Sequence, residues 1–356
     1  MKVLFLYTPN QSLLSHFYEE LLKMLVKDGH EVFVFYEKKN PTHYKKHGVV
    51  YAGQLKGSLI SRYLNVYNSI KVYCPDVLIS NFSYINPALI CGKLLGVKRN
   101  IAWFHTAFSH SQRHWFHVWF KSQCFKLADV VITNSKTLSQ DMQEYYQVNP
   151  LKLVEIPFWT TIGGQIGATF QEQYTKKEGQ KDIGIPGRLV KDKNHDLVLR
   201  SLAHLKLSGF SWRLFIAGSG PYEKELKRLC DTLSIADNVV FLGDLSTKQM
   251  IGFYKQMDFL VLPSMHEAFG LVFIEATAIG APVIVSKAFG ALDFIDVQTF
   301  DCDSFVFDPS DQEDLNEKLL TFFNENGPSS QYFKELYLNT YDKLGIYSQI
   351  QKTIQF

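Results

Sequence analysis

Short apolar runs alternate along the first part of the chain with segments whose apolar residues recur at helical spacing. Residues 3–7 form such a run, and residues 13–26 show the helical spacing and end before Gly29. Residues 31–36 are again β-branched and aromatic, so the order predicted is strand, helix, strand. The alternation continues, with elements expected at 76–80, 86–95, 99–104 and 129–134. Continuous apolar strands separated by helices indicate a parallel sheet covered on both faces.

The pattern is interrupted after residue 157 by a stretch rich in Gly, Gln and Lys, and then it restarts. Strands are expected at 183–186, 212–217, 239–242, 259–263 and 282–286, and helices at 194–207, 222–234 and 269–279. The predicted fold class is therefore α/β, with two Rossmann-like doubly wound domains that face a cleft. The expected parts are an N-terminal domain at 1–160, a connecting segment at 161–182, a second domain at 183–335 and a C-terminal helix at 336–356 that could pack back on the first domain.

Charge is divided unevenly between the two halves of the chain. The whole sequence of 356 residues has 37 Lys+Arg and 35 Asp+Glu, which argues against a strongly basic nucleic-acid-binding protein. Residues 1–157 alone carry 18 Lys+Arg and 10 Asp+Glu, an excess of eight positive charges, and the remainder has an excess of six negative charges. One half could therefore face an anionic partner, although uneven solvation of two ordinary surfaces would look the same.

The cysteines and the apolar segments bear on the location of the protein. Five Cys are scattered along the sequence without zinc-ligand spacing, which is typical of reduced thiols in the cytosol. The apolar run near the N-terminus is too short for a signal peptide, and no run reaches the length of a spanning helix. We therefore expect a cytoplasmic protein that could lie at the inner face of the cell membrane.

The strongest chemical signal is the segment HEAFGLVFIE, which follows the strand expected at 259–263. Glu267 lies in the loop and Glu275 on the helix that follows, about 12 Å apart along the axis. The N-terminus of that helix offers free N–H groups, and Gly270 allows a ligand to approach the backbone. Two carboxylates at this separation could accept hydrogen bonds from hydroxyls at the two ends of an activated sugar nucleotide.

Two weaker signals also follow strands. Arg188 and Lys193 come after the first strand of the second domain, where two cations could neutralise a diphosphate as the bond to a sugar breaks. His105 follows a strand of the first domain, where an imidazole could position a reacting hydroxyl. Taken alone, either motif is also compatible with ordinary surface or structural residues.

Together, these motifs resemble the retaining, metal-independent nucleotide-sugar glycosyltransferases of the GT-B fold (glycosyl transferases group 1, or family 4 type), which build bacterial surface polysaccharides. Glu267 and Glu275 match the hallmark of that family, two Glu separated by seven residues. The segment GRLVKDK, with Arg188 and Lys193, matches its donor motif, and GSGP at 218–221 matches its glycine turn. The resemblance extends over most of the chain and is most specific between residues 183 and 290.

The resemblance implies a set of donor-binding residues. They are Arg188, Lys193, Leu245, Phe269, Gly270, Leu271 and Glu275. Arg188 and Lys193 would hold the donor diphosphate, Glu275 would bind the ribose hydroxyls, and Leu245 would contact the base through its backbone. Glu267 would hold the donor sugar together with the amides of the three residues that open the following helix.

The resemblance also implies the reaction. His105 would lie beside the reacting centre, with Glu267 as the second catalytic residue. Attack on the same face as the departing diphosphate would retain the anomeric configuration and would require neither a metal nor another cofactor. The first loop, TPNQSLLSHF, lacks the Gly-Gly pair of the family, and IPFW at 156–159 replaces its IPNG segment. Both departures affect the acceptor side or the hinge, so the glycan or lipid-linked acceptor is the least transferable part of the resemblance.

Residues 111–126 combine basic and aromatic side chains at helical spacing. They could contact an anionic membrane peripherally, or the aromatic rings could simply fill the core. His110, His114 and His117 have the spacing of a metal-binding helix face, but no carboxylate or Cys accompanies them, so no metal site is predicted.

Several rival functions remain open at this stage. A phosphorylase or epimerase with the same donor half predicts sugar-phosphate chemistry. An NAD-dependent oxidoreductase predicts dinucleotide binding, and a non-catalytic partner of another glycosyltransferase predicts donor binding without turnover.

Overall fold

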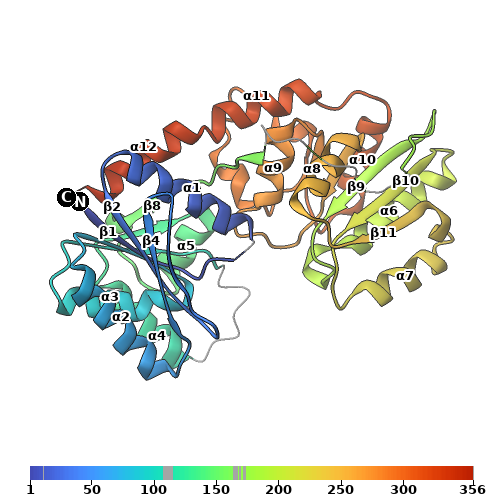
Figure 1. The fold of residues 1–356 in the computed structure, drawn as a ribbon. Helices are drawn as coiled ribbons and strands as arrows, with labels where there is room; N and C mark the ends of the chain where they lie inside the picture. Colours follow the sequence, from blue (N-terminus) through green and yellow to red (C-terminus); the bar gives the residue numbers. More distant parts are fainter. Residues whose placement is uncertain (11, 107–114, 163–166, 168–169, 171–173, 356) are drawn as a thin grey trace. The chain divides into compact units, whose positions relative to one another are not determined.

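The computed structural model describes residues 1–356 except 11, 107–114, 163–166, 168–169, 171–173 and 356. The chain divides into two compact units. Unit 1 comprises Met1–Phe158 together with Lys343–Phe356, and unit 2 comprises Trp159–Asp342 (Figure 1). The segment 161–182, which the sequence pattern separates as a connection, belongs to unit 2. The last part of the chain returns to unit 1 from residue 343, seven residues later than the predicted boundary.

Unit 1 is built on one sheet with the strand order β3-β4-β2-β1-β5-β6-β7-β8. Its strands are β1 (Lys2–Leu6), β2 (Glu31–Lys38), β3 (His43–Lys46), β4 (Val49–Leu55), β5 (Val77–Asn81), β6 (Arg99–Trp103), β7 (Val130–Thr133) and β8 (Leu153–Glu155). All neighbours are parallel except β3 and β4. The β3 edge strand has the sequence HYKK and is exposed throughout. It has no apolar pattern from which a strand could be predicted.

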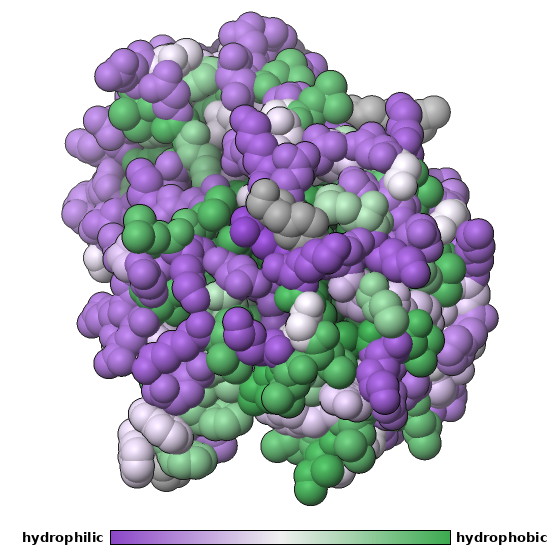
Figure 2. Space-filling model, turned by 90° about the vertical axis from the view of Figure 1, so that its left-hand side faces the viewer, coloured by the Kyte–Doolittle hydropathy of each residue, from purple (hydrophilic) through white to green (hydrophobic). Residues whose placement is uncertain are grey.

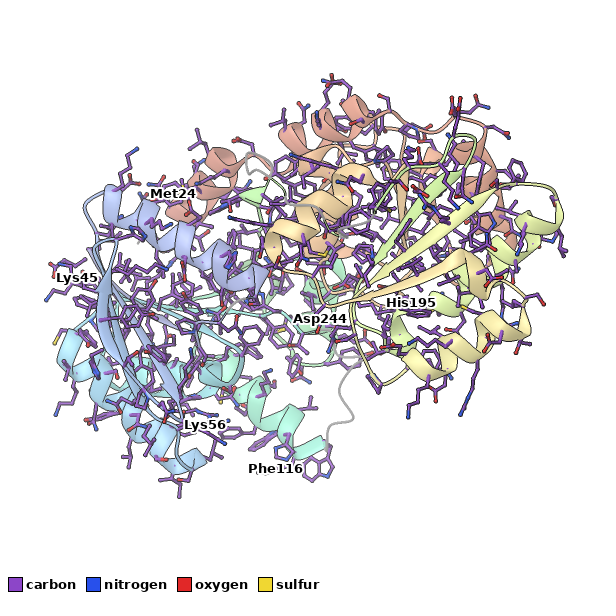
Figure 3. All side chains as sticks on the ribbon, turned by 45° about the vertical axis from the view of Figure 1, so that its right-hand side comes forward. Met24, Lys45, Lys56, Phe116, His195 and Asp244 are labelled. Atoms are coloured by element: carbon purple, nitrogen blue, oxygen red, sulfur yellow. The ribbon has the colours of Figure 1, made fainter. Side chains whose placement is uncertain are left out.

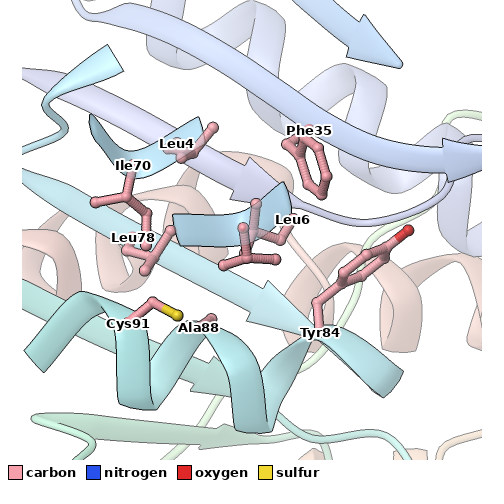
Figure 4. Packing of buried hydrophobic residues seen from close by; sticks show 9 residues of the cluster. Leu4, Leu6, Phe35, Ile70, Leu78, Tyr84, Ala88 and Cys91 are labelled. Atoms are coloured by element: carbon pink, nitrogen blue, oxygen red, sulfur yellow. The ribbon is translucent and has the colours of Figure 1, made fainter. Parts of the chain in front are cut away.

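Helices cover both faces of this sheet. They are α1 (Leu13–Lys27), α2 (Leu59–Tyr73), α3 (Ile85–Leu94), α4 (Trp115–Phe125), α5 (Lys136–Glu144) and α12 (Lys343–Ile354). In Figure 1, α2, α3 and α4 lie on one side of the sheet and α1 and α12 on the other. Figure 4 shows how aliphatic side chains of the sheet, such as Leu6 and Leu78, are buried against α2 and α3.

The C-terminal helix α12 is attached to unit 1 by polar contacts. The Tyr347 hydroxyl donates to the carboxylate of Asp28 at 2.6 Å. Arg99 Nε donates to the carbonyl oxygen of Thr353 at 3.0 Å. The helix also buries Ile346, Ile350 and Ile354, so the last residues of the chain are part of the core of unit 1.

Unit 2 contains a wholly parallel sheet with the order β11-β10-β9-β12-β13-β14. Its strands are β9 (Lys181–Pro186), β10 (Trp212–Ala217), β11 (Val239–Gly243), β12 (Phe259–Leu262), β13 (Val283–Ser286) and β14 (Val306–Phe307). Its helices are α6 (His195–Leu207), α7 (Glu223–Thr232), α8 (Thr247–Gln256), α9 (Leu271–Ile279), α10 (Gln312–Phe323) and α11 (Ser330–Thr340).

The strand order explains where ligands should bind in each unit. The order reverses between β1 and β5 in unit 1 and between β9 and β12 in unit 2. In open parallel sheets, ligands bind beyond the carboxyl ends of the strands at such a switch point. The two α/β domains predicted from the sequence are confirmed, and the chemistry is to be sought in the loops that follow these strands.

Candidate functional site

In unit 2, the loops after the two switch-point strands are joined. Arg188 and Lys193 follow β9, and Glu267 follows β12. The ammonium group of Lys193 forms an ion pair with the carboxylate of Glu267. The amide of Met265 donates to the carbonyl oxygen of Asp192 at 2.9 Å and ties the same two loops together. The fold therefore brings together residues that are 74 positions apart in the sequence.

The glycine turn after β10 supports the loop that carries Arg188. The backbone of Gly218 has a φ of 141°, and a Cβ there would overlap the carbonyl oxygen of Gly187. The amide of Leu189 also donates to the carbonyl oxygen of Ser219 at 2.9 Å. Only glycine allows this close approach, so the turn packs directly against the backbone of the Arg188 loop. The Arg188 side chain itself is exposed.

Leu245 lies in the loop between β11 and α8 and is half-buried. The preceding residue, Asp244, accepts a hydrogen bond from the Ser219 hydroxyl at 2.9 Å. The amide of Gly218 donates to the carbonyl oxygen of Gly243 at 2.8 Å. These bonds connect the Leu245 loop to the glycine turn, which also contacts the Arg188 loop.

Gly270 opens helix α9 in a conformation that other residues rarely adopt. Its φ is 100°, and a Cβ there would overlap the ring of Phe289. The loop before it is held to the segment after β13, because the amide of Gly290 donates to the carbonyl oxygen of Glu267 at 3.2 Å. Phe269 and Leu271 flank Gly270, so the three predicted donor-binding amides lie in one turn at the N-terminus of the helix.

Glu275 lies one turn into α9 and is buried, with 4 % of its surface exposed. Burial raises the pKa of its carboxyl group to about 8, and a hydrogen bond from the Tyr254 hydroxyl at 3.1 Å opposes this shift. The carboxyl group is therefore mostly protonated at pH 7. A ligand that donated hydrogen bonds to it would favour the ionised form.

His105 follows β6 in unit 1, and a neighbouring amide defines its tautomer. The side chain of Asn134 donates through Nδ2 to the carbonyl oxygen of Ile156 and accepts through Oδ1 from the indole N–H of Trp103 at 3.1 Å. The orientation of the amide is thereby set. Its Oδ1 lies 2.7 Å from His105 Nδ1, so Nδ1 carries the hydrogen.

The other ring nitrogen of His105 also has partners within unit 1. With the hydrogen on Nδ1, Nε2 can only accept, and the Tyr18 hydroxyl lies 2.6 Å from it. Asn81 Oδ1, 2.8 Å from Nε2, is itself an acceptor and takes a hydrogen bond from the Tyr18 hydroxyl at 2.6 Å. Burial lowers the pKa of His105 to about 3, so the ring is neutral at pH 7. Both nitrogens are therefore engaged, and a reacting hydroxyl would have to replace one of these partners to bind to the ring.

Sequence reasoning did not single out Tyr18, Asn81 or Asn134. Asn81 ends β5 and Asn134 directly follows β7, the strands on either side of β6. Polar residues at the ends of adjacent parallel strands meet at one edge of the sheet, and this rule could have identified both Asn residues. Tyr18 comes from the buried face of α1 and carried no such signal.

A cavity of about 520 Å³ opens beside His105 in unit 1. Its walls include Phe82 after β5, Asn86 on α3, and Phe104 and Thr106 after β6. Lys121 of α4 also contributes to the walls, with its ammonium group 4.4 Å from the centre of the Phe104 ring. Aromatic walls with a few polar groups are typical of a ligand-binding pocket.

Helix α4 forms part of the segment 111–126, whose aromatic side chains were expected either to contact a membrane or to fill the core. The rings of Trp115, Phe116 and Trp119 are exposed, whereas Phe125 at the other end of the helix is buried. Residues 111–114, with His114, and also His110 lie outside the described residues. Among the residues that are described, no group of three His, Cys, Asp or Glu could hold a metal ion, and no helix is long and apolar enough to cross a membrane.

Comparison with known families assigns both units. A family model for "Glycosyl transferases group 1" matches residues 168–336, and one for "Glycosyltransferase Family 4" matches residues 15–158. The chain belongs to the GT-B glycosyltransferases. The predicted family and fold are thus confirmed.

Curated relatives of this glycosyltransferase match about half of its length. A glycosyltransferase of Methanocaldococcus jannaschii is 31 % identical over 172 residues, which is 46 % of this chain and 44 % of that protein. The alpha-monoglucosyldiacylglycerol synthase of Streptococcus pneumoniae is 30 % identical over 164 residues, which is 42 % of this chain and 37 % of that protein. The matched parts therefore span less than half of these relatives.

Solved structures resemble the glycosyltransferase along its whole length. The lipopolysaccharide outer core galactosyltransferase WaaB in its apo form has a TM-score of 0.76 and 16 % identity, with 99 % of each chain covered. Anabaena HepE in complex with UDP has a TM-score of 0.76 and 16 % identity, with 99 % of each chain covered. At this identity, the two structures establish a shared fold.

Proposed function

We propose that this glycosyltransferase transfers a sugar, with retention of anomeric configuration, from a UDP-linked donor to a glycan or lipid-linked acceptor in surface polysaccharide biosynthesis. The observation that carries the proposal is the ion pair between Lys193 and Glu267, which unites the two donor motifs at the switch point of unit 2. Glu275 and Gly270 lie on the helix that begins beside this pair.

The donor would bind along these loops in extended form. Arg188 and Lys193 would hold the diphosphate, and Glu275 would accept hydrogen bonds from the ribose hydroxyls. Glu267 and the amides at the start of α9 would hold the sugar, and Leu245 would contact the base. A UDP donor is supported by HepE, whose structures of the same fold contain UDP and UDP-glucose.

The proposed reaction needs no metal and no other cofactor. The acceptor oxygen attacks C1 of the sugar on the face from which the diphosphate departs. The new C1–O bond forms as the bond between C1 and the diphosphate breaks, and the acceptor proton passes to the departing phosphate oxygen. Arg188 and Lys193 would stabilise the negative charge that develops there. His105 would position groups beside the reacting centre, with its neutral ring held by Asn134.

A lipid-linked acceptor is supported by the surface of unit 1. Trp115, at the start of α4, is 76 % exposed, and Ile60, at the start of α2, is 74 % exposed. Figure 2 shows hydrophobic side chains at the lower edge of this face, and Lys56 and Phe116 lie at the same lower end of unit 1 in Figure 3. The sequence between residues 38 and 128, which includes both helices, contains 13 Lys or Arg and one acidic residue, and this excess of positive charge favours contact with anionic lipid.

The membrane contact predicted for residues 111–126 thus extends to α2 in this proposal. Two similar proteins have names that refer to membrane lipids, an alpha-monoglucosyldiacylglycerol synthase of S. pneumoniae and a lipopolysaccharide outer core galactosyltransferase, and these names agree with a site at the inner face of the cell membrane. In a flotation assay with anionic vesicles, Ile60→Asp should reduce binding several-fold. Val72→Asp is the matched control, because Val72 is 73 % exposed at the opposite end of α2 and should not change binding. Equal binding by both variants would refute this surface.

The donor proposal is tested by calorimetry and by turnover. Arg188→Ala and Glu275→Ala should each weaken UDP binding by about tenfold or more, because each removes a charge-assisted or buried hydrogen bond. His105→Ala should retain UDP binding and lose transfer. Unchanged UDP affinity in both donor-site variants would refute the donor site. Binding without turnover in the unaltered chain would favour a non-catalytic partner, and binding of NAD instead of UDP would favour an oxidoreductase.

A further inference from the structure

His195, the first residue of α6, has no assigned role and is almost completely buried, with 1 % of its surface exposed. Neither nitrogen of its ring has a hydrogen-bond partner among the described residues. Buried polar groups in folded proteins are rarely left without partners, because the lost hydration costs free energy. The ring is therefore available to a water molecule or another bound group. Figure 3 shows His195 in the interior of unit 2.

A small cavity lies against this ring. Its volume is about 30 Å³, and its walls include Gly187, Ser264 and the two members of the donor-site ion pair, Lys193 and Glu267. A cavity of this size holds a water molecule when polar groups line it. Most of its other wall residues are apolar, such as Ile185, Leu262 and Phe289, so the imidazole, the ion pair and Ser264 supply the polar groups around a space that fits one water molecule.

The position of the ring is set by the backbone before α6. Asn194 adopts the left-handed conformation, with a φ of 54°, and its side-chain Nδ2 donates to the carbonyl oxygen of Pro309 at 2.9 Å. The amide of Lys193 donates to the carbonyl oxygen of Val190 at 3.0 Å. Lys193 and His195 are thereby held on one rigid turn, so a group bound by the ring is held near the Lys193 side chain.

The charge state of the ring suits a bridging role. Burial lowers the pKa of His195 to about 4, helped by the nearby charge of Lys193 and opposed by Asp196. At pH 7 the ring is neutral, with one nitrogen that donates and one that accepts. It can therefore donate to, or accept from, a water molecule without adding a second positive charge beside Lys193.

We propose that His195 is a positioning residue of the donor site: its imidazole holds a buried water molecule in this cavity, and the water keeps Lys193 and Glu267 in the arrangement that binds the donor. The kinetic part of this inference rests on the proposed function, because it concerns the same site. The structural part, a water molecule bound to His195, does not depend on it.

The kinetic experiment compares three variants of the full chain in the hydrolysis of a nucleotide sugar without acceptor. His195→Leu removes the hydrogen bonds and should lower kcat by about tenfold or more, the effect of losing one hydrogen bond to a charged pair, with a smaller change in KM. His195→Gln can still bind the water and should restore much of kcat. His204→Leu changes an exposed His on the same helix and should have no effect.

Thermal unfolding separates a positioning role from a structural one. If the water is absent, replacing an orphan imidazole by leucine should raise the melting temperature and leave kcat unchanged, which would overturn the proposal. An equal loss of kcat and of thermal stability in the Leu and Gln variants would overturn it as well. Loss of kcat in the Leu variant at an unchanged melting temperature, with recovery in the Gln variant, supports it.

A crystal structure of the full chain tests the water directly. A water molecule within hydrogen-bond distance of a His195 nitrogen is expected, and an empty cavity would overturn the proposal. If the unaltered chain hydrolyses no nucleotide sugar in a broad panel, the proposed function fails, and the crystallographic result still decides the inference about His195.

Discussion

The buried carboxyl group of Glu275 should make the stability of unit 2 fall as the pH rises. Burial raises its pKa from 4.5 to about 8 in the folded chain, and the unfolded chain keeps the ordinary value. Between these two values, the folded chain holds a proton that the unfolded chain has released. The stabilisation due to this proton is fully present below about pH 4.5 and is lost as the pH rises through about 8.

The size of the effect follows from the width of this interval. Each pH unit inside it changes the free energy of unfolding by about 1.4 kcal/mol. From about pH 5.5 to about pH 7.5, the contribution of Glu275 should therefore fall by about 2–3 kcal/mol. For a domain of this size, such a change lowers the melting temperature by roughly 5–10 °C.

The assay compares Glu275→Gln with the unaltered chain by calorimetry across this range of pH. Glutamine has nearly the same shape and can still accept the hydrogen bond from Tyr254, but it does not titrate. The difference in melting temperature between the two proteins isolates the proton on Glu275. Glu335→Gln, at an exposed carboxylate on α11, is the control and should show no pH-dependent difference.

Two results would contradict this reasoning. A difference between the Gln variant and the unaltered chain that stays constant with pH would show that Glu275 has the same pKa in the folded and unfolded states. A difference of opposite slope would show that the folded chain holds the group ionised, so that hydrogen bonding, and not burial, dominates its environment.

Four further results are expected. In titration calorimetry, the affinity for UDP should rise with pH more steeply in the unaltered chain than in Glu275→Gln, because ribose hydroxyls bind the ionised carboxylate better. Parallel pH profiles of the two proteins would contradict this. Gly270→Ala should destabilise unit 2 by about 2 kcal/mol in urea unfolding, because its Cβ overlaps the ring of Phe289 and its φ is positive, and an unchanged midpoint would be inconsistent with this strain. Asn134→Ala should lower the free energy of unfolding by about 2–3 kcal/mol in the same assay, because it removes the hydrogen-bond partner of His105 Nδ1. An unchanged free energy of unfolding would show that the amide does not stabilise the fold. Chelation by EDTA should leave the hydrolysis of a nucleotide sugar unchanged, and its loss would argue for a metal.

Local sequence patterns were sufficient for most of the buried elements. The apolar run at 3–7 became the central strand β1, and the segment at 13–26 became α1, because burial on one or both faces imposes a periodicity that can be read directly. The elements that were not predicted include the exposed edge strand β3, the helix α2 and also the mostly buried strand β4. β3 has no apolar period, and the first turns of α2 expose Leu59 and Ile60, where an amphipathic helix would place polar residues.

The candidate site could also be predicted in part. The spacing of Glu267 and Glu275, with Gly270 between them, requires only local geometry, since a loop and one helix carry all three residues. The cations of the donor motif could be placed after a strand, but not against a particular carboxylate. Their neighbours depend on which strands lie side by side, and β9 and β12 are separated by two other strands in the sequence.

Tertiary structure alone decided the charge states and the partners of the buried polar groups. Glu275 titrates near neutral pH and His105 does not because desolvation and fixed hydrogen bonds act on each, and both effects come from residues distant in the sequence. The sequence could not show that the ring of His195 is buried beside Lys193 and Glu267, with no hydrogen-bond partner among the residues that the structure describes. Periodicity and spacing describe neighbours along one element, whereas burial and hydrogen bonding depend on the packing of elements that the chain brings together only when it folds.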